Sequence, residues 1–167
     1  MTSNELIKIG SNFLKQNNIK SYMIDSELIF SSVSGQLREN ILLNSNFKLN
    51  QTQIKSFNKL VFRRALSKEP IAYLLNNKEF WSMKLKIDKG VLIPRPETEI
   101  LVEKLARYFK GHNPFILDVG TGSGCIIISL LQELNKSRGI GIDISTKALK
   151  IATINSKINN TFNRIKF

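Results

Sequence analysis

The chain has 167 residues and a formal net charge of +12, with 25 lysines and arginines against 13 acidic residues. No segment approaches the roughly 18 consecutive apolar residues of a membrane span, and the N-terminus lacks a secretion signal, so we expect a cytoplasmic protein without a membrane partner. A single cysteine excludes an internal disulfide and a multi-cysteine metal site, and we predict no metal.

The first part of the chain has the 3.6-residue period of helices. Asn50 can cap a long helix in which Phe57 and Val61 recur at helical spacing. The other expected helices are one capped by Ser3 and ending at Asn17, one from Asp25 to Gly35, one over 38–43, and one over 69–75 with Pro70 at its first position. Together they predict a small helical domain over residues 1–77.

From Glu79 onward the period changes from 3.6 to 2, which predicts a half-buried strand over residues 81–87. A hairpin-type turn over residues 88–90 and a returning strand over 91–93 would complete a β-hairpin. We expect this hairpin, within residues 78–95, to link two domains. The prolines on either side of Arg95 favour an extended backbone there, and Pro96 can open a helix that ends at Gly111.

The stretch 115–125, Phe-Ile-Leu-Asp-Val-Gly-Thr-Gly-Ser-Gly-Cys, is the most informative part of the sequence. Its apolar start predicts a buried parallel strand, and its glycines predict a turn into a helix over 126–134 whose free N–H groups can face a ligand. A second buried strand over 139–142 ends at Asp143, a carboxylate that can accept hydrogen bonds from ribose hydroxyls. A helix over 147–158 and the start of a third strand over 164–167 follow.

This arrangement fits a nucleotide-type cofactor. The dinucleotide pattern G-x-G-x-x-G is not met, because its sixth position is Cys125 or Ile127, so NAD is the weaker interpretation. The stretch instead resembles the S-adenosyl-L-methionine site of class I methyltransferases. The cofactor-binding residues that we predict are Asp118, Gly120, Thr121, Gly122, Ser123, Gly124 and Asp143. Cys125 is interpreted as a small buried residue without a catalytic role.

Four segments in order extend the resemblance: Glu-Pro-Ile-Ala-Tyr-Leu-Leu at 69–75, Lys-Glu-Phe-Trp at 78–81, Val-Leu-Ile-Pro-Arg-Pro-Glu-Thr-Glu at 91–99, and Leu-Asp-Val-Gly-Thr-Gly-Ser-Gly at 117–124. Together they resemble the protein-glutamine N5-methyltransferases that modify peptide chain release factors. The resemblance implies that the helical domain helps to recognise the release factor, that the hairpin and Arg95 border the active site, and that residues 120–124 with Asp143 hold the cofactor.

The family's substrate motif, Asn-Pro-Pro-Tyr, does not occur in this sequence. Its four prolines stand at 70, 94, 96 and 114 and are never adjacent, so we assign no catalytic residue, and the Asn113-Pro114 pair precedes the first strand of the sheet. We therefore expect an α/β chain with a helical bundle, a linking hairpin, and over residues 96–167 the first part of a Rossmann-like methyltransferase domain. Such a chain is expected to be an N-terminal portion of an enzyme and inactive by itself.

Two other functions remain open. An RNA or DNA adenine-N6 methyltransferase would share the cofactor turn and suit the basic charge, but the segment 94–99 and the helical domain favour a protein substrate, so nucleic acid is not expected as the direct substrate. A non-catalytic fragment that docks on a release factor or on the ribosome is the other alternative. The charge itself has a simpler explanation, because asparagine, isoleucine and lysine are abundant along the whole sequence.

Overall fold

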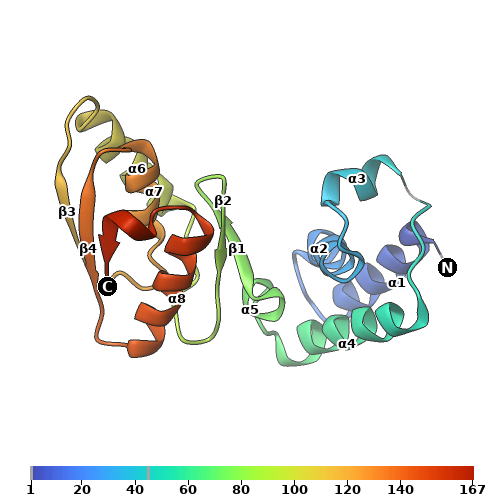
Figure 1. Ribbon diagram of the computed structural model, residues 1–167. Helices are drawn as coiled ribbons and strands as arrows, with labels where there is room; N and C mark the ends of the chain where they lie inside the picture. Colours follow the sequence, from blue (N-terminus) through green and yellow to red (C-terminus); the bar gives the residue numbers. More distant parts are fainter. Residues whose placement is uncertain (1, 45) are drawn as a thin grey trace. The chain divides into compact units, whose positions relative to one another are not determined.

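The computed structural model describes residues 2–44 and 46–167, which form two compact units, Met1–Leu75 and Asn76–Phe167. The first unit is entirely helical (Figure 1). Its helices are α1 (Ser3–Gln16), α2 (Tyr22–Ser34), α3 (Arg38–Leu43), α4 (Gln51–Ser67) and α5 (Ile71–Leu75). The helical domain predicted from the sequence is thus present.

The helix ends follow the capping residues, with one correction. Asn50 caps α4 as predicted, since its side chain accepts from the Gln53 N–H (2.9 Å). For α1 the cap is Thr2, so the prediction of Ser3 was wrong: Glu5 stands three residues after Thr2, and the two form a reciprocal capping box. Similarly, α2 begins at Tyr22 and not at Asp25.

The core of the first unit forms where α1, α2 and α4 meet. Phe30 and Phe57 are fully buried and pack edge to face, with ring centroids 6.2 Å apart. Gly10 allows α2 and the Phe57 ring to lie close to α1, because a Cβ atom there would lie 2.6 Å from Ser26 Oγ and 2.8 Å from Phe57 Cζ. Helix packing in this unit therefore depends on a small residue in α1 facing an aromatic ring in α4.

The second unit is an α/β structure, which confirms the predicted fold class. A hairpin of β1 (Asn77–Phe80) and β2 (Met83–Lys86) is followed by α6 (Glu97–Tyr108), β3 (Phe115–Val119), α7 (Cys125–Glu133), β4 (Arg138–Ile142), α8 (Thr146–Ile158), a short 3₁₀ helix η1 (Phe162–Arg164) and β5 (Ile165–Lys166). The parallel sheet has the order β3-β4-β5, so consecutive strands are neighbours. The predicted third strand is therefore present as β5.

The hairpin differs from the prediction. The partner of β2 is β1, which precedes it, and residues 91–93 form no strand. The chain turns at Trp81 and Ser82, whose φ angles are +51° and +55°, and this pair of positive values is what a tight two-residue hairpin requires. Neither residue is a glycine or an asparagine, so the sequence pattern placed the turn at residues 88–90 instead.

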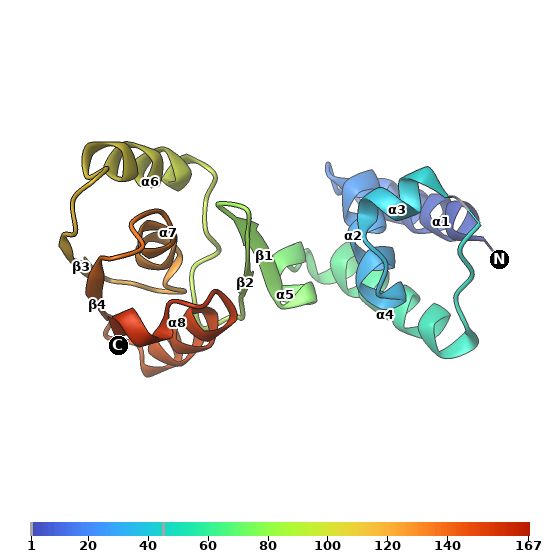
Figure 2. The same cartoon turned by 45° about the horizontal axis from the view of Figure 1, so that its top comes forward.

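One face of the parallel sheet is uncovered, as the first part of a methyltransferase domain implies, although the apolar stretch 115–119 has the pattern of a buried strand. Figure 2 shows α6, α7 and α8 on the same side of β3 and β4, with no helix among the described residues on the other side. Phe115, Leu117 and Val119 are accordingly 67%, 61% and 71% exposed. The sequence pattern was that of a fully buried strand, but in the described structure the residues of β3 on the helix-bearing face, Ile116 and Asp118, are half-buried.

In the ranges 2–44 and 46–167, every helix is too short or too polar to cross a membrane.

Candidate cofactor site

The glycine-rich turn, residues 120–124, connects the end of β3 to the start of α7 as predicted. Gly120, Gly122 and Gly124 have φ angles of +77°, +55° and +79°, a region that other residues rarely adopt. A Cβ atom at Gly120 would meet no described atom within 4 Å, and one at Gly122 would meet only the Gly120 carbonyl oxygen, at 3.9 Å. The outer side of the turn is therefore open backbone that a ligand can approach closely.

Gly124 has a different role from the other two glycines. A Cβ atom there would lie 2.8 Å from Ile128 Cδ1 and 3.3 Å from Ala152 Cβ. The inner side of the turn thus packs directly against α7 and α8, and Gly124 is required by packing as well as by its φ angle.

Asp143 joins the turn to the end of β4. Its Oδ2 accepts a hydrogen bond from the Gly122 N–H (2.9 Å), and its Oδ1 accepts from the Ser145 N–H (2.9 Å) at the start of α8. A carboxylate offers about four acceptor positions, so acceptor capacity remains for ligand hydroxyls. The Ile142 carbonyl adds to the connection by accepting from the N–H groups of Gly120 (2.8 Å) and Thr121 (2.9 Å).

Asp118 supports the turn from the last part of β3. Its Oδ2 accepts from Thr121 Oγ1 (2.8 Å). Burial raises the pKa of the Asp118 carboxyl above its usual range and the charge of Asp143 adds to this, while hydrogen bonds from Thr121 and the Ile127 N–H act in the opposite direction. Thr121 and Ser123 are only 4% and 2% exposed, so these two residues support the turn from inside and offer a ligand almost no surface.

All seven predicted cofactor residues therefore gather at one place in the structure. Cys125 lies beside them, and burial raises the pKa of its thiol, so it is held in the unreactive protonated form. Arg95 is not part of this group. It is exposed, its carbonyl accepts from the Thr98 N–H (3.0 Å), and among the described residues no hydrogen bond or ion pair joins its guanidinium to the turn.

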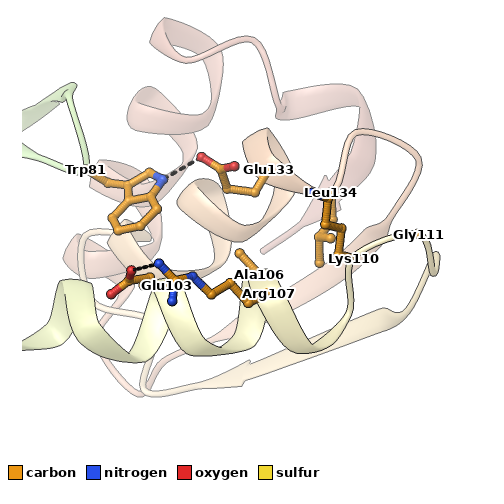
Figure 3. A pocket seen from close by; sticks show the side chains of 8 residues that line it. All are labelled: Trp81, Glu103, Ala106, Arg107, Lys110, Gly111, Glu133 and Leu134. Carbon is orange, nitrogen blue, oxygen red and sulfur yellow. Dashed lines mark hydrogen bonds and ion pairs between the residues drawn. The ribbon is translucent and has the colours of Figure 1, made fainter.

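Glu99, in the segment 94–99, holds the hairpin turn, a role that the sequence did not indicate. Its Oε1 accepts from the backbone N–H of Trp81 (2.8 Å), and the Trp81 indole N–H donates to Glu133 Oε1 (2.8 Å). Beside the indole lies a cavity of about 400 Å³ (Figure 3). Its walls include Glu103 and Arg107 of α6, which form an ion pair.

This cavity is separate from the glycine-rich turn. Glu133 and Leu134, which line it, stand at the C-terminal end of α7, whereas the turn adjoins the N-terminal end of the same helix. A helix of this length spans about 13 Å. The cavity therefore does not extend the candidate site.

Asn155 of α8 is a second residue that sequence reasoning missed. It is fully buried and contacts both the glycine-rich turn and the hairpin. The available signal was its position on the apolar stripe of α8, where it follows Ala148, Ile151 and Ala152 at helical spacing. A polar side chain on such a stripe needs buried hydrogen-bond partners.

Among the described residues, no group of three or more histidine, cysteine, aspartate or glutamate side chains is placed so that it could hold a metal ion.

Comparison with known proteins gives two family matches. A family model described as the PrmC N-terminal domain matches residues 5–75, and one described as a methyltransferase domain matches residues 111–167. The two matches fall in different units of the structure.

Curated relatives extend over both units. The release factor glutamine methyltransferase of Buchnera aphidicola subsp. Acyrthosiphon pisum is 41% identical over 152 residues, which cover 90% of this chain and 54% of that protein. That of Caulobacter vibrioides is 37% identical, covering 86% of this chain and 50% of that protein. A bifunctional methyltransferase of Rickettsia prowazekii is 36% identical, with coverages of 86% and 31%. The chain thus spans about half the length of the release factor enzymes that it matches.

Proposed function

Since the chain belongs to the release factor glutamine methyltransferase family, of which it spans the N-terminal part, we propose that its second unit binds S-adenosylmethionine. The observation that carries the proposal is the open glycine-rich turn next to Asp143. In the proposed complex, the backbone of Gly120 and Gly122 lies against the cofactor, and Asp143 accepts hydrogen bonds from its ribose hydroxyls.

The residues present fit this cofactor on two observations. The space above Gly120 and Gly122 is the space that a side chain would fill, and Asp143 uses only part of its acceptor capacity on the chain's own N–H groups. Because those bonds already fix the turn and the carboxylate, little reorganisation accompanies binding. When bound, S-adenosylmethionine supplies an electrophilic methyl group.

The names of the relatives give a glutamine of a release factor as the substrate, and the proposed acceptor is the side-chain amide nitrogen of that glutamine, as the family resemblance implies. We assign recognition of that protein to the helical unit, whose residues 5–75 match the family's N-terminal domain. A release factor substrate would also place the chain in the cytoplasm, where translation ends.

Residues 1–167 are proposed to bind the cofactor without catalysing transfer. Methyl transfer to an amide requires the acceptor nitrogen to be held in line with the methyl group, which is catalysis by positioning. The family motif that is implied to do this, Asn-Pro-Pro-Tyr, is absent from the 167 residues. Without it, the chain has an electrophile site and no group assigned to orient the nucleophile.

Co-expression with a release factor tests this proposal. The 167-residue chain carrying an affinity tag is expected to retain the release factor, and mass spectrometry is expected to find the release factor glutamine unmethylated. The full-length Buchnera relative, expressed in the same cells, serves as the positive control, and the host's own enzyme is deleted. A methylated glutamine in the presence of the 167-residue chain alone, or no retention of the release factor, would contradict the proposal.

A further inference from the structure

Asn155 makes hydrogen bonds to two separate segments of the second unit. Its Nδ2 donates to the Ser123 carbonyl of the glycine-rich turn (2.9 Å). The same amide pairs with the backbone of Lys86 in β2, donating to its carbonyl (3.0 Å) and accepting from its N–H (2.6 Å). One fully buried side chain thus links α8, the hairpin and the turn.

The pairing with Lys86 resembles the pairing of two strands. The amide of Asn155 offers one acceptor and one donor to the N–H and carbonyl of a single residue, as a neighbouring strand would. Asn159, the C-cap residue of α8, donates to the Lys84 carbonyl (3.3 Å). The outer edge of β2 is therefore contacted by the side chains of Asn155 and Asn159, from α8 and its C-cap, and not by a third strand.

Only Asn155 also reaches the glycine-rich turn. The turn is held on one side by Asp143, which accepts from the Gly122 N–H, and on the other by Asn155, which donates to the next residue's carbonyl. These two contacts fix the Thr121–Gly122 and the Ser123–Gly124 peptide groups, which stand on either side of the Gly122–Ser123 peptide. The orientation of the backbone that faces the open side depends on both.

From this geometry we propose that Asn155 is a positioning residue: it holds the glycine-rich turn in its binding shape and couples that shape to the hairpin. The effect on ligand affinity rests on the proposed function, whereas the effect on the turn does not. Asn155 acts on the turn through the Ser123 carbonyl and not by touching a ligand.

The test compares Asn155→Ala with Asn159→Ala. Both remove an asparagine contact from α8 to β2, but only the first removes the contact to the turn. We expect Asn155→Ala to speed amide hydrogen exchange at Gly122 and Gly124, measured by NMR, while Asn159→Ala leaves both rates unchanged. Affinity for S-adenosylhomocysteine, measured by calorimetry, is expected to fall about tenfold in Asn155→Ala, the factor that corresponds to about 1.4 kcal/mol.

Equal exchange rates at Gly122 and Gly124 in the two variants would overturn the proposal. If the wild-type chain does not bind S-adenosylhomocysteine, the proposed function fails, but the exchange comparison still decides the role of Asn155. Asn155→Ser, which keeps one hydrogen-bonding group, gives the same comparison if Asn155→Ala does not fold. A purely structural role would lower the melting temperature and leave affinity, measured well below that temperature, unchanged.

Discussion

Arg64→Ala is expected to destabilise the helical unit by about 3–5 kcal/mol, the usual result of removing one partner from a buried ion pair. Arg64 Nε lies 2.6 Å from Asp25 Oδ2, and the two side chains are 15% and 3% exposed. Ser21 Oγ also donates to Asp25, and Arg64 Nη1 donates to the carbonyls of Lys68 and Glu69 beyond the end of α4. The substitution therefore leaves a buried carboxylate uncompensated and two carbonyls without their donor.

Hydrogen exchange of the slowest amides around Phe30 and Phe57 measures this loss in the helical unit itself. Lys59→Ala is the control, because Lys59 is an exposed cation on the same helix. The double variant Asp25→Asn/Arg64→Met should recover part of the stability, since it removes both charges. A loss below about 1 kcal/mol in Arg64→Ala would mean that the pair behaves as a surface salt bridge.

Gly139→Val is expected to destabilise the second unit by about 3 kcal/mol or more, at the upper end of overpacking effects. A Cβ atom at Gly139 would lie 2.5 Å from the Ile116 carbonyl oxygen of the paired strand and 2.9 Å from Ile127 Cδ1 of α7. The closest atom belongs to backbone and cannot rotate away. The glycine is thus needed for β3, β4 and α7 to pack together.

Trp81 is the single tryptophan of the chain and lies in the second unit, so its fluorescence during urea unfolding reports on that unit alone. Arg138→Val is the matched control, because it places the same side chain on the preceding, exposed residue of β4. Gly139→Val should shift the unfolding midpoint far below that of the wild type, and Arg138→Val should not. Equal midpoints for the two variants would show that the strand can accommodate the side chain.

The elements that the sequence predicted correctly depend on local chemistry. Asn50 and Gln53, three residues apart, form the capping box at the start of α4. Gly35 ends α2 in the left-handed conformation that favours glycine. That the candidate cofactor residues lie together was predictable for a related reason. The carboxyl ends of neighbouring parallel strands meet at one edge of a sheet, so the residues after β3 and β4 had to lie together.

The features that the sequence did not predict depend on residues distant in the chain. The hairpin turn at Trp81 has no glycine or asparagine to mark it, and its backbone is held by Glu99 and its ring by Glu133. Asn155 gave a signal, but its partners, Lys86 and Ser123, could be identified only in the folded structure.

The most direct test of the central claim is a calorimetric titration of the 167-residue chain with S-adenosylhomocysteine, with Gly122→Val and Gly111→Val for comparison. Both glycines have positive φ angles and no close neighbours, but Gly111 lies outside the turn. We predict saturable binding to the wild type and to Gly111→Val, and none to Gly122→Val, where a β-branched side chain occupies the space of the ligand. Equal affinity of Gly122→Val and the wild type, or no binding to the wild type, would contradict the claim that this turn is the cofactor site.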